Sequence, residues 1–283
     1  MSNVDEVIAL VLKEPKQDGV DFSGYDLKGV SLNGVSFVFS TFNGTDMENG
    51  ELMEINFKQA TLDDISLKKA KLKNVDFTGT SLLNANFEET ALVGCNFKNA
   101  ILENTNFSSA TLKECSFKGS NLSYSNLYDA KLENCDLSFS RAMYSYMKQI
   151  QIQNTPMNGM NGRGADLSFS QLTDVTLAGS ILKYADLNSC TFKNVNLTNA
   201  NLVGVELKDS HCSGIQIEEA NLEGADLTYA NLEGCNLKNA FLLEANLHGT
   251  NFTNANLMDA YMVDANIAKA ITKGANLENT ILQ

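Results

Sequence analysis

The sequence predicts a repeat protein built from units of five residues, and three observations support this. Large apolar residues recur at every fifth position, a small residue lies two positions before each of them, and glycine or asparagine often follows two positions after. The stretch "ANLEGADLTYANLEGCNL", residues 220–237, shows the pattern clearly. This period belongs neither to a helix nor to a strand, so we expect each unit to turn a corner.

The central apolar residue falls on every number ending in 2 or 7 from Phe22 to Leu282, which gives 53 units without an insertion. Of these centres, 31 are Leu, 11 Phe, 4 Met and 3 Ile. The centre is therefore an inward position, and the small residue before it completes the filling of a narrow interior. The departures are Ala142, Gly162, Cys212 and Thr272.

The residue two positions after the centre is expected to form the corner. Of the 19 glycines, 17 lie there, and asparagine occupies many of the remaining corners. Glycine and asparagine tolerate the positive φ angles that tight turns require. The pattern therefore predicts one tight turn in every unit.

The unit A-(D/N)-L-x-x resembles the pentapeptide repeat family, and the resemblance covers residues 20–283. It implies an all-β fold, a right-handed quadrilateral parallel β-helix in which four pentapeptides form one coil, and hence about 13 coils. Residues 20 apart would then lie above one another. An interior aromatic stack is expected from Phe37, Phe57, Phe77, Phe97 and Phe117.

Residues 1–19 are expected to form a capping helix and lead-in, ahead of a single β-helix that spans residues 20–283. The helix is predicted over residues 3–14, with Asn3 as a candidate N-cap and Pro15 ending it. A solenoid end exposes core and backbone, so a cap is expected there. The apolar face of this helix consists of Val4, Val7, Ile8 and Val11.

The composition argues against several classes of function. The 34 acidic residues outnumber the 21 basic ones, so neither direct nucleic-acid binding nor binding to an anionic membrane is expected. The start, "MSNVDEVIALVLKEP", predicts no signal peptide and no membrane span, which favours a cytoplasmic protein. Five of the six cysteines occupy the small inward position, which predicts buried free thiols.

No catalytic, cofactor-binding or metal-binding residues are predicted. His211 and His248 lie on different expected faces and have no cysteine or carboxylate at convincing ligand spacing. Phosphate-binding, dinucleotide-binding and nucleophile motifs are absent from the sequence. A non-enzymatic protein without a cofactor is therefore expected.

The pattern weakens at "SRAMYSYMKQIQIQNTPMNGMNGRG", residues 140–164, but the five-residue frame continues through it. This predicts reshaped coils instead of an unfolded hinge, with a local bulge or bend allowed by Pro156 and its neighbouring glycines. Tyrosine and arginine often dominate binding interfaces, and both arginines of the chain lie here. The predicted partner-binding residues are Arg141, Tyr144, Tyr146, Arg163, Tyr124 and Tyr184.

A second apolar cluster is predicted near the C-terminus, where Phe241, Tyr261 and Ile281 share one column. Contiguous apolar patches of this kind commonly mark interfaces. The cluster is the candidate surface for self-association, which would make the protein a homodimer.

These observations lead to three hypotheses of function. The first is a scaffold or interaction rod that binds another protein or a second copy of itself. The second follows from the resemblance alone: some family members mimic DNA and protect or inhibit type II topoisomerases such as gyrase. The third, again from the family, is a repeat module of a bacterial effector that is secreted into the host cytosol.

Overall fold

A computed structural model of the chain describes residues 3–282. The chain divides into two compact units at Arg141 and Ala142, inside the segment 140–164. Both units are all-parallel β-solenoids, and the first begins with a short helix. Each unit is described by itself below.

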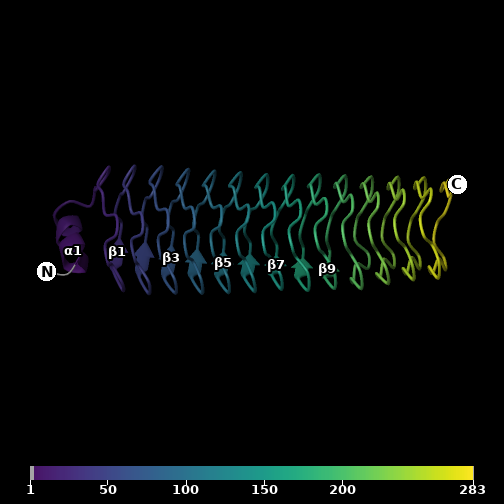
Figure 1. Cartoon of the computed structure of the whole chain (residues 1–283), viewed down its shortest axis with the longest axis horizontal. Helices are drawn as coiled ribbons and strands as arrows, with labels where there is room; N and C mark the ends of the chain where they lie inside the picture. The colour runs from purple at the N-terminus through teal and green to yellow at the C-terminus, as the bar shows by residue number, and fades with distance from the viewer. Residues whose placement is uncertain (1–2, 283) are drawn as a thin grey trace. The chain divides into compact units, whose positions relative to one another are not determined.

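Each coil has four sides and is 20 residues long. Parallel bridges join residues 20 positions apart, such as Lys16 and Ser36, and they recur at every fifth residue. Such bridges extend to Arg141 in the first unit and from Tyr146 to Ile281 in the second. Successive coils are therefore joined on all four sides, as the turns in Figure 1 show.

Backbone hydrogen bonds hold each side to the next coil in both directions. The Phe57 N–H donates to the Asp76 carbonyl at 2.8 Å, and the Asp76 N–H donates to the Ile55 carbonyl at 2.9 Å. This alternation is the hydrogen-bond pattern of a parallel sheet. It repeats at every unit and explains why an insertion in the five-residue frame would break the ladder.

One side of the first nine coils is regular enough to form three-residue strands, and their number is lower than the expected number of about 13 coils. Later coils bridge at single residues only. In the first unit β1 to β6 pair in sequence order, and in the second unit β7 to β9 do so, always with a register of 20 residues. The strands are β1 (Ser31–Asn33), β2 (Glu51–Met53), β3 (Lys71–Lys73), β4 (Ala91–Val93), β5 (Thr111–Lys113), β6 (Lys131–Glu133), β7 (Gln151–Gln153), β8 (Gln171–Thr173) and β9 (Thr191–Lys193).

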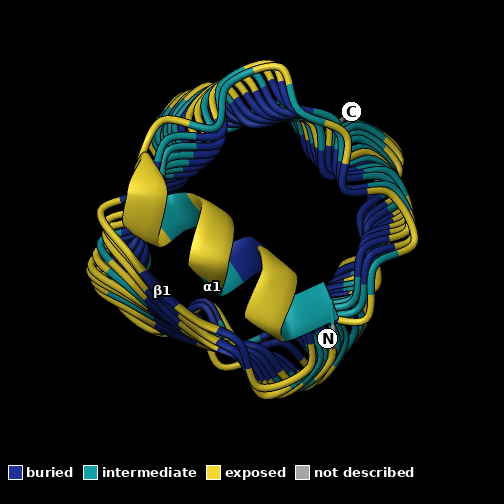
Figure 2. Ribbon diagram, turned by 90° about the vertical axis from the view of Figure 1, so that its left-hand side faces the viewer, coloured by how far each residue is buried: buried dark blue, intermediate teal, exposed yellow. Residues whose placement is uncertain are grey.

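The interior is filled by the centres and the small residues before them, as the sequence predicts. The Phe97 ring stacks between Phe77 and Phe117, with ring centroids 4.7 Å from each and interplanar angles of 9° and 6°. A second column stacks Phe87 on Phe107 at 4.8 Å. The predicted aromatic stack is thus confirmed in the first unit, and Figure 2 shows the inner face of the coils as buried.

The corners adopt positive φ at every fifth residue from Gly19 to Asn279. All 17 glycines predicted at corners do so, but so do phenylalanine, tyrosine, glutamate and lysine. No valine, isoleucine or threonine occupies a described corner, because branching at Cβ makes this conformation especially unfavourable. The glycine and asparagine signal therefore located the corners correctly but covered only some of their residue types.

The Asp or Asn before each centre helps to form the corner. The Asp166 carboxylate accepts a hydrogen bond from the Ser168 N–H at 2.9 Å, and the Asp226 carboxylate accepts one from the Thr228 N–H at 3.0 Å. Such side-chain bonds to the backbone two residues later are typical of Asx turns. This explains the polar position of the repeat unit.

Helix α1 (Asn3–Lys13) lies across the open end of the first coil, as Figure 2 shows. Val7 is fully buried, whereas Leu12 on the opposite face is 80% exposed. The Asn3 side-chain oxygen accepts a hydrogen bond from the Asp26 N–H of the first coil at 3.4 Å. Asn3 is the first described residue of the helix and thereby ties the helix to the coil.

All six cysteines are free and buried, which confirms the prediction from their repeat position. Burial raises the pKa of Cys190 to about 12 and that of Cys235 to about 11. A protonated, inaccessible thiol is a poor nucleophile. We therefore expect a thiol-specific disulfide reagent to label none of the six in the folded protein at mildly alkaline pH, and all six after unfolding in guanidinium. Rapid labelling of the native protein would contradict this.

The segment 142–164 keeps the regular coil geometry. Bridges join Tyr146 to Asp166 and Pro156 to Thr176 in the same 20-residue register. A Cβ on Gly162 would lie 2.9 Å from the Met160 methyl carbon. The large Met160 therefore fills the space that the missing side chain of Gly162 leaves, and the coil stays regular, without the bulge that the sequence allowed.

Candidate protein-binding surfaces

Two corner tyrosines of the second unit lie flat over glycines of the following coil. A Cβ on Gly164 would lie 2.6 Å from two carbons of the Tyr144 ring, and one on Gly204 would lie 2.7 Å from the Tyr184 ring. The glycines thus leave room for the rings. Both rings remain accessible, with Tyr144 49% and Tyr184 58% exposed.

Arg163 links these two corners. The Tyr144 N–H donates to the Arg163 carbonyl at 2.9 Å, and the Arg163 guanidinium carbon lies 5.6 Å from the centroid of the Tyr184 ring. This distance is within the range of a cation–π interaction. The structure therefore brings three of the predicted binding residues together at one corner.

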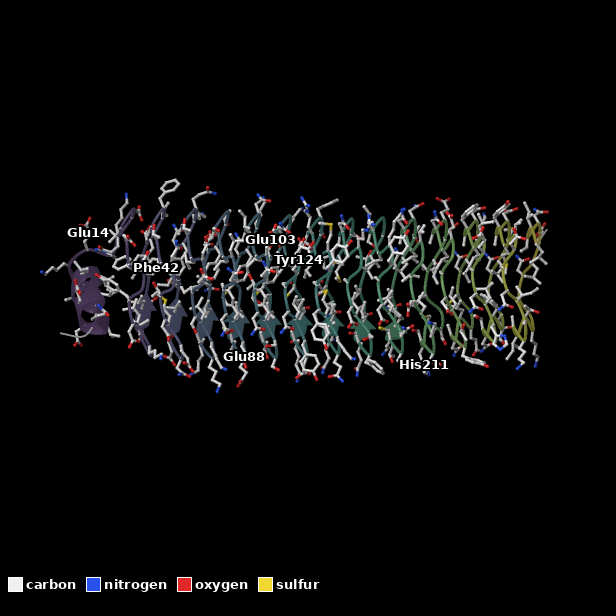
Figure 3. The ribbon with its side chains drawn as sticks, in the orientation of Figure 1. Glu14, Phe42, Glu88, Glu103, Tyr124 and His211 are labelled. Carbon is white, nitrogen blue, oxygen red and sulfur yellow. The ribbon has the colours of Figure 1, made fainter. Side chains whose placement is uncertain are left out.

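Tyr146 lies on the next side of the same coil, beside Asp166, and is 42% exposed. We call Tyr144, Tyr146, Arg163 and Tyr184 the Tyr–Arg patch. The remaining two predicted residues, Tyr124 and Arg141, belong to the first unit. Tyr124 is an exposed corner residue of that unit, labelled in Figure 3.

Two further aromatic–cation pairs were missed by the sequence analysis. The Lys148 ammonium lies 4.9 Å from the centroid of the Phe169 ring, and Lys118 lies 5.9 Å from that of Phe139. In all three pairs the cation precedes a corner aromatic by 21 residues, one coil plus one position. That spacing is readable in the sequence and would have identified Phe169, which is 54% exposed, as part of the surface.

The predicted C-terminal cluster is a continuous apolar surface on one side of the second unit. Phe241 and Tyr261 are bridge partners and their rings stack at 4.9 Å with an interplanar angle of 2°. Ile281 continues the row and is 48% exposed. A second row runs parallel to it. We call Phe241, Leu243, Tyr261, Val263 and Ile281 the apolar face.

Four acidic residues share one column on another side of the second unit, namely Asp166, Asp186, Glu206 and Asp226. Burial, and to a lesser degree the neighbouring Asp166 and Glu206, raise the pKa of Asp186. Lys208 lies 3.6 Å from Glu206 and 3.4 Å from Asp226, which offsets part of the negative charge.

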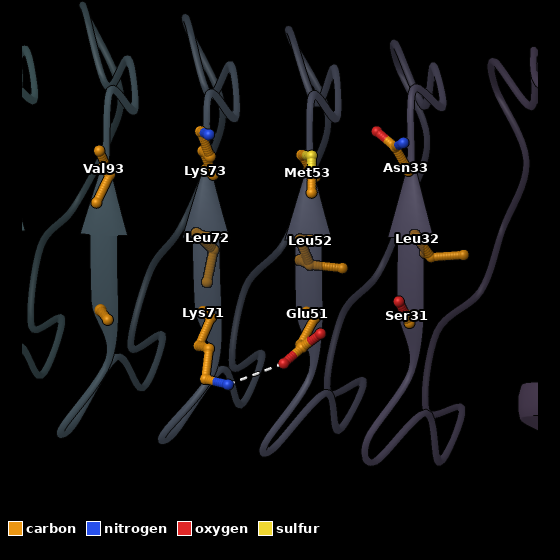
Figure 4. A pocket seen from close by; sticks show the side chains of 11 residues that line it. Ser31, Leu32, Asn33, Glu51, Leu52, Met53, Lys71, Leu72, Lys73 and Val93 are labelled. Atoms are coloured by element: carbon orange, nitrogen blue, oxygen red, sulfur yellow. Dashed lines mark hydrogen bonds and ion pairs between the residues drawn. The ribbon is translucent and has the colours of Figure 1, made fainter.

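In the first unit, a shallow trough of about 350 Å³ runs across β1 to β4 (Figure 4). Its walls are the outward side chains on either side of the buried leucines, and Lys71 is paired with Glu51 at 2.9 Å. The walls carry both charged and apolar groups without a common chemistry. The trough therefore indicates no specific ligand.

Among residues 3–282 there is no group of three or more side chains placed to hold a metal ion. His211 is exposed on the surface (Figure 3), and the His248 ring meets Tyr229 edge-on at 5.5 Å. Over the same residues, no helix has the length and apolar character needed to cross a membrane.

Comparison with known families settles the classification. Residues 90–167 and 165–242 match the pentapeptide repeat region family, and residues 18–52, 51–87, 60–99 and 225–262 match pentapeptide repeats of eight copies. The chain belongs to the pentapeptide repeat family. The coil architecture described above is the one that the sequence resemblance implied.

Several solved structures of pentapeptide repeat proteins resemble the chain. HetL from the cyanobacterium Nostoc sp. strain PCC 7120, involved in heterocyst differentiation regulation, is 22% identical, with 100% of this chain and 97% of HetL covered and a TM-score of 0.37. QnrB1, a plasmid-mediated fluoroquinolone resistance protein, is 14% identical, with 64% and 92% covered and a TM-score of 0.31. No curated protein matches the chain. At these TM-scores the similarities carry no argument about function.

Proposed function

We propose that this pentapeptide repeat protein is a protein-interaction module whose principal contact surface is the Tyr–Arg patch. The observation that carries the proposal is the stacking of Arg163 on the exposed Tyr184 ring, next to Tyr144 in its glycine slot. Tyrosine and arginine are enriched among residues that dominate binding energy. Holding the rings against the backbone of the next coil reduces the entropy lost on binding.

The test is capture of a partner from extracts of the native host by the immobilised protein. We expect the double variant Arg163→Ala/Tyr184→Ala to lose the captured partner, because both halves of the stacked pair are removed. Each such contact residue typically costs about 2 kcal/mol or more on truncation, or roughly thirtyfold in affinity.

Tyr229→Ala provides the matched control. Tyr229 is also an exposed corner tyrosine, 56% accessible, and it lies over Gly249 in the same way. It belongs to a different corner and has no arginine above its ring among the described contacts. Capture that survives the double variant, or that Tyr229→Ala abolishes equally, would contradict the proposed surface.

A second candidate function is the protection or inhibition of a type II topoisomerase by DNA mimicry. The net charge of −13 and the column of Asp166, Asp186, Glu206 and Asp226 favour it, because a line of regularly spaced carboxylates presents negative charge as a nucleic-acid strand does. A gyrase supercoiling assay with a quinolone present tests this function. The absence of both inhibition and protection would exclude it, and a true effect should weaken in Asp166→Asn/Asp186→Asn.

A further inference from the structure

We propose that the apolar face is the docking site of a positively charged amphipathic helix, lying parallel to the coil axis. This is a second binding surface, separate from the Tyr–Arg patch. The inference rests on three features of residues 223–281: an exposed two-row apolar strip, acidic residues along both of its edges, and a coil spacing close to the pitch of a helix.

The strip consists of outward side chains on both sides of the buried centres Leu242 and Met262. One row contains Phe241, Tyr261 and Ile281, which are successive bridge partners, and the other contains Leu243 and Val263. All of these side chains are accessible to solvent in part. The row begins after Asn221, the bridge partner of Phe241, so the apolar surface is confined to these coils.

Acidic residues border the strip on both edges. Glu244 and Asp264 are exposed corner residues on one edge, and Asp259 is an exposed corner residue on the other. Glu223 lies at the end of the second row. Within the described part of the chain none of these four carboxylates forms an ion pair, although Asp259 accepts a hydrogen bond from Asn279 at 3.0 Å.

A helix suits the spacing of this surface. Stacked coils repeat at ~4.8 Å, the strand spacing, and one turn of a helix rises ~5.4 Å. Over three coils the mismatch amounts to only about 1 Å. Apolar side chains at every third or fourth position of the helix would therefore meet successive coils, and a helix about 10–12 Å wide fits between the two corners, which are at most ~17 Å apart.

The charges select the partner. Lys or Arg along both edges of the apolar stripe of the helix would lie opposite Glu244 and Asp264 on one side and Asp259 on the other. A second copy of this chain would instead bring one acidic border against another, which is unfavourable by Coulomb repulsion. Charge complementarity thus favours a basic partner over self-association, the occupant that the sequence analysis expected.

The experiment uses the full chain and a synthetic helical peptide of about four turns, with leucines in one stripe and lysines along both edges. Fluorescence anisotropy gives the affinity, and circular dichroism follows the gain of helix. We expect Tyr261→Asp to weaken binding at least tenfold. We expect Glu244→Gln/Asp264→Asn, which changes only exposed side chains, to weaken binding at low salt and to flatten its salt dependence.

Ile181→Asp is the matched control, because Ile181 occupies the same outward position and is 39% exposed but lies outside the strip. It and Arg163→Ala/Tyr184→Ala should bind the peptide as the unmodified protein does, which separates this site from the Tyr–Arg patch. A peptide with glutamate in place of lysine should not bind.

Three results would overturn the proposal. The first is equal affinity for the lysine and glutamate peptides. The second is unchanged binding by both Tyr261→Asp and Glu244→Gln/Asp264→Asn. The third is a concentration-dependent dimer in sedimentation equilibrium that Tyr261→Asp abolishes, which would assign the face to a second copy.

Discussion

Replacing Phe97 by alanine is expected to lower the free energy of unfolding by about 3–5 kcal/mol, the range typical of phenylalanine truncation in a core. The Phe97 ring is fully buried and stacks on Phe77 and Phe117 at 4.7 Å. Its loss leaves a cavity in a narrow interior and removes two stacking contacts at once. Urea unfolding followed by circular dichroism measures the effect.

Phe97→Leu is the control for this prediction. The same column continues with the buried Leu137, so the coil geometry accommodates leucine at this position. We expect the loss to be less than half of that for alanine, because most of the volume is retained. Equal losses for the two variants would show that the aromatic column does not determine stability in this unit.

Replacing Gly204 by alanine is expected to destabilise the protein by about 2–3 kcal/mol and to displace the Tyr184 ring. A Cβ at this residue, whose φ is +62°, would lie 2.7 Å from the Tyr184 ring. The cost combines the strain of a left-handed alanine, about 1–2 kcal/mol, with the energy of moving the ring. Fluorine NMR of fluorotyrosine-labelled protein detects the ring movement, and urea unfolding gives the free energy.

Gly224→Ala separates the two contributions. Gly224 occupies the same corner of the next coil with the same φ of +62°, but a Cβ there meets nothing within 4 Å. It should show the backbone cost alone, with the Tyr184 signal unchanged. If both variants destabilise equally and neither moves the ring, the glycine slot has no role in positioning Tyr184.

The coil architecture was predictable because every unit repeats the same physical problem. The centre, the small residue and the corner each have a narrow set of suitable side chains, so even Ala142 and Gly162 could be assigned to the frame. The compensation of Gly162 by Met160 was also readable from the sequence, because a missing large side chain calls for a large neighbour.

The surfaces were less predictable, because outward positions accept many residue types. Arg163 and Tyr184 were selected for their composition, but their contact depends on a diagonal between adjacent coils that residue spacings of five and 20 do not reveal. Phe169 was missed for the same reason. The corner angles of residues such as Phe39 and Tyr144 were unexpected, because the coil imposes a conformation that these residues rarely adopt alone.

The 20-residue register sets how this protein can change its length. Arg163 and the apolar face occupy the same side of the second unit, because their residue numbers differ by whole coils apart from small offsets. Deleting one pentapeptide between residues 205 and 220 would keep a sealed core but rotate everything downstream by a quarter turn, separating the two surfaces onto adjacent sides. Deleting one whole coil would preserve their alignment and only shorten the distance between them. Viable length variants should therefore differ by multiples of four units wherever a partner contacts both surfaces.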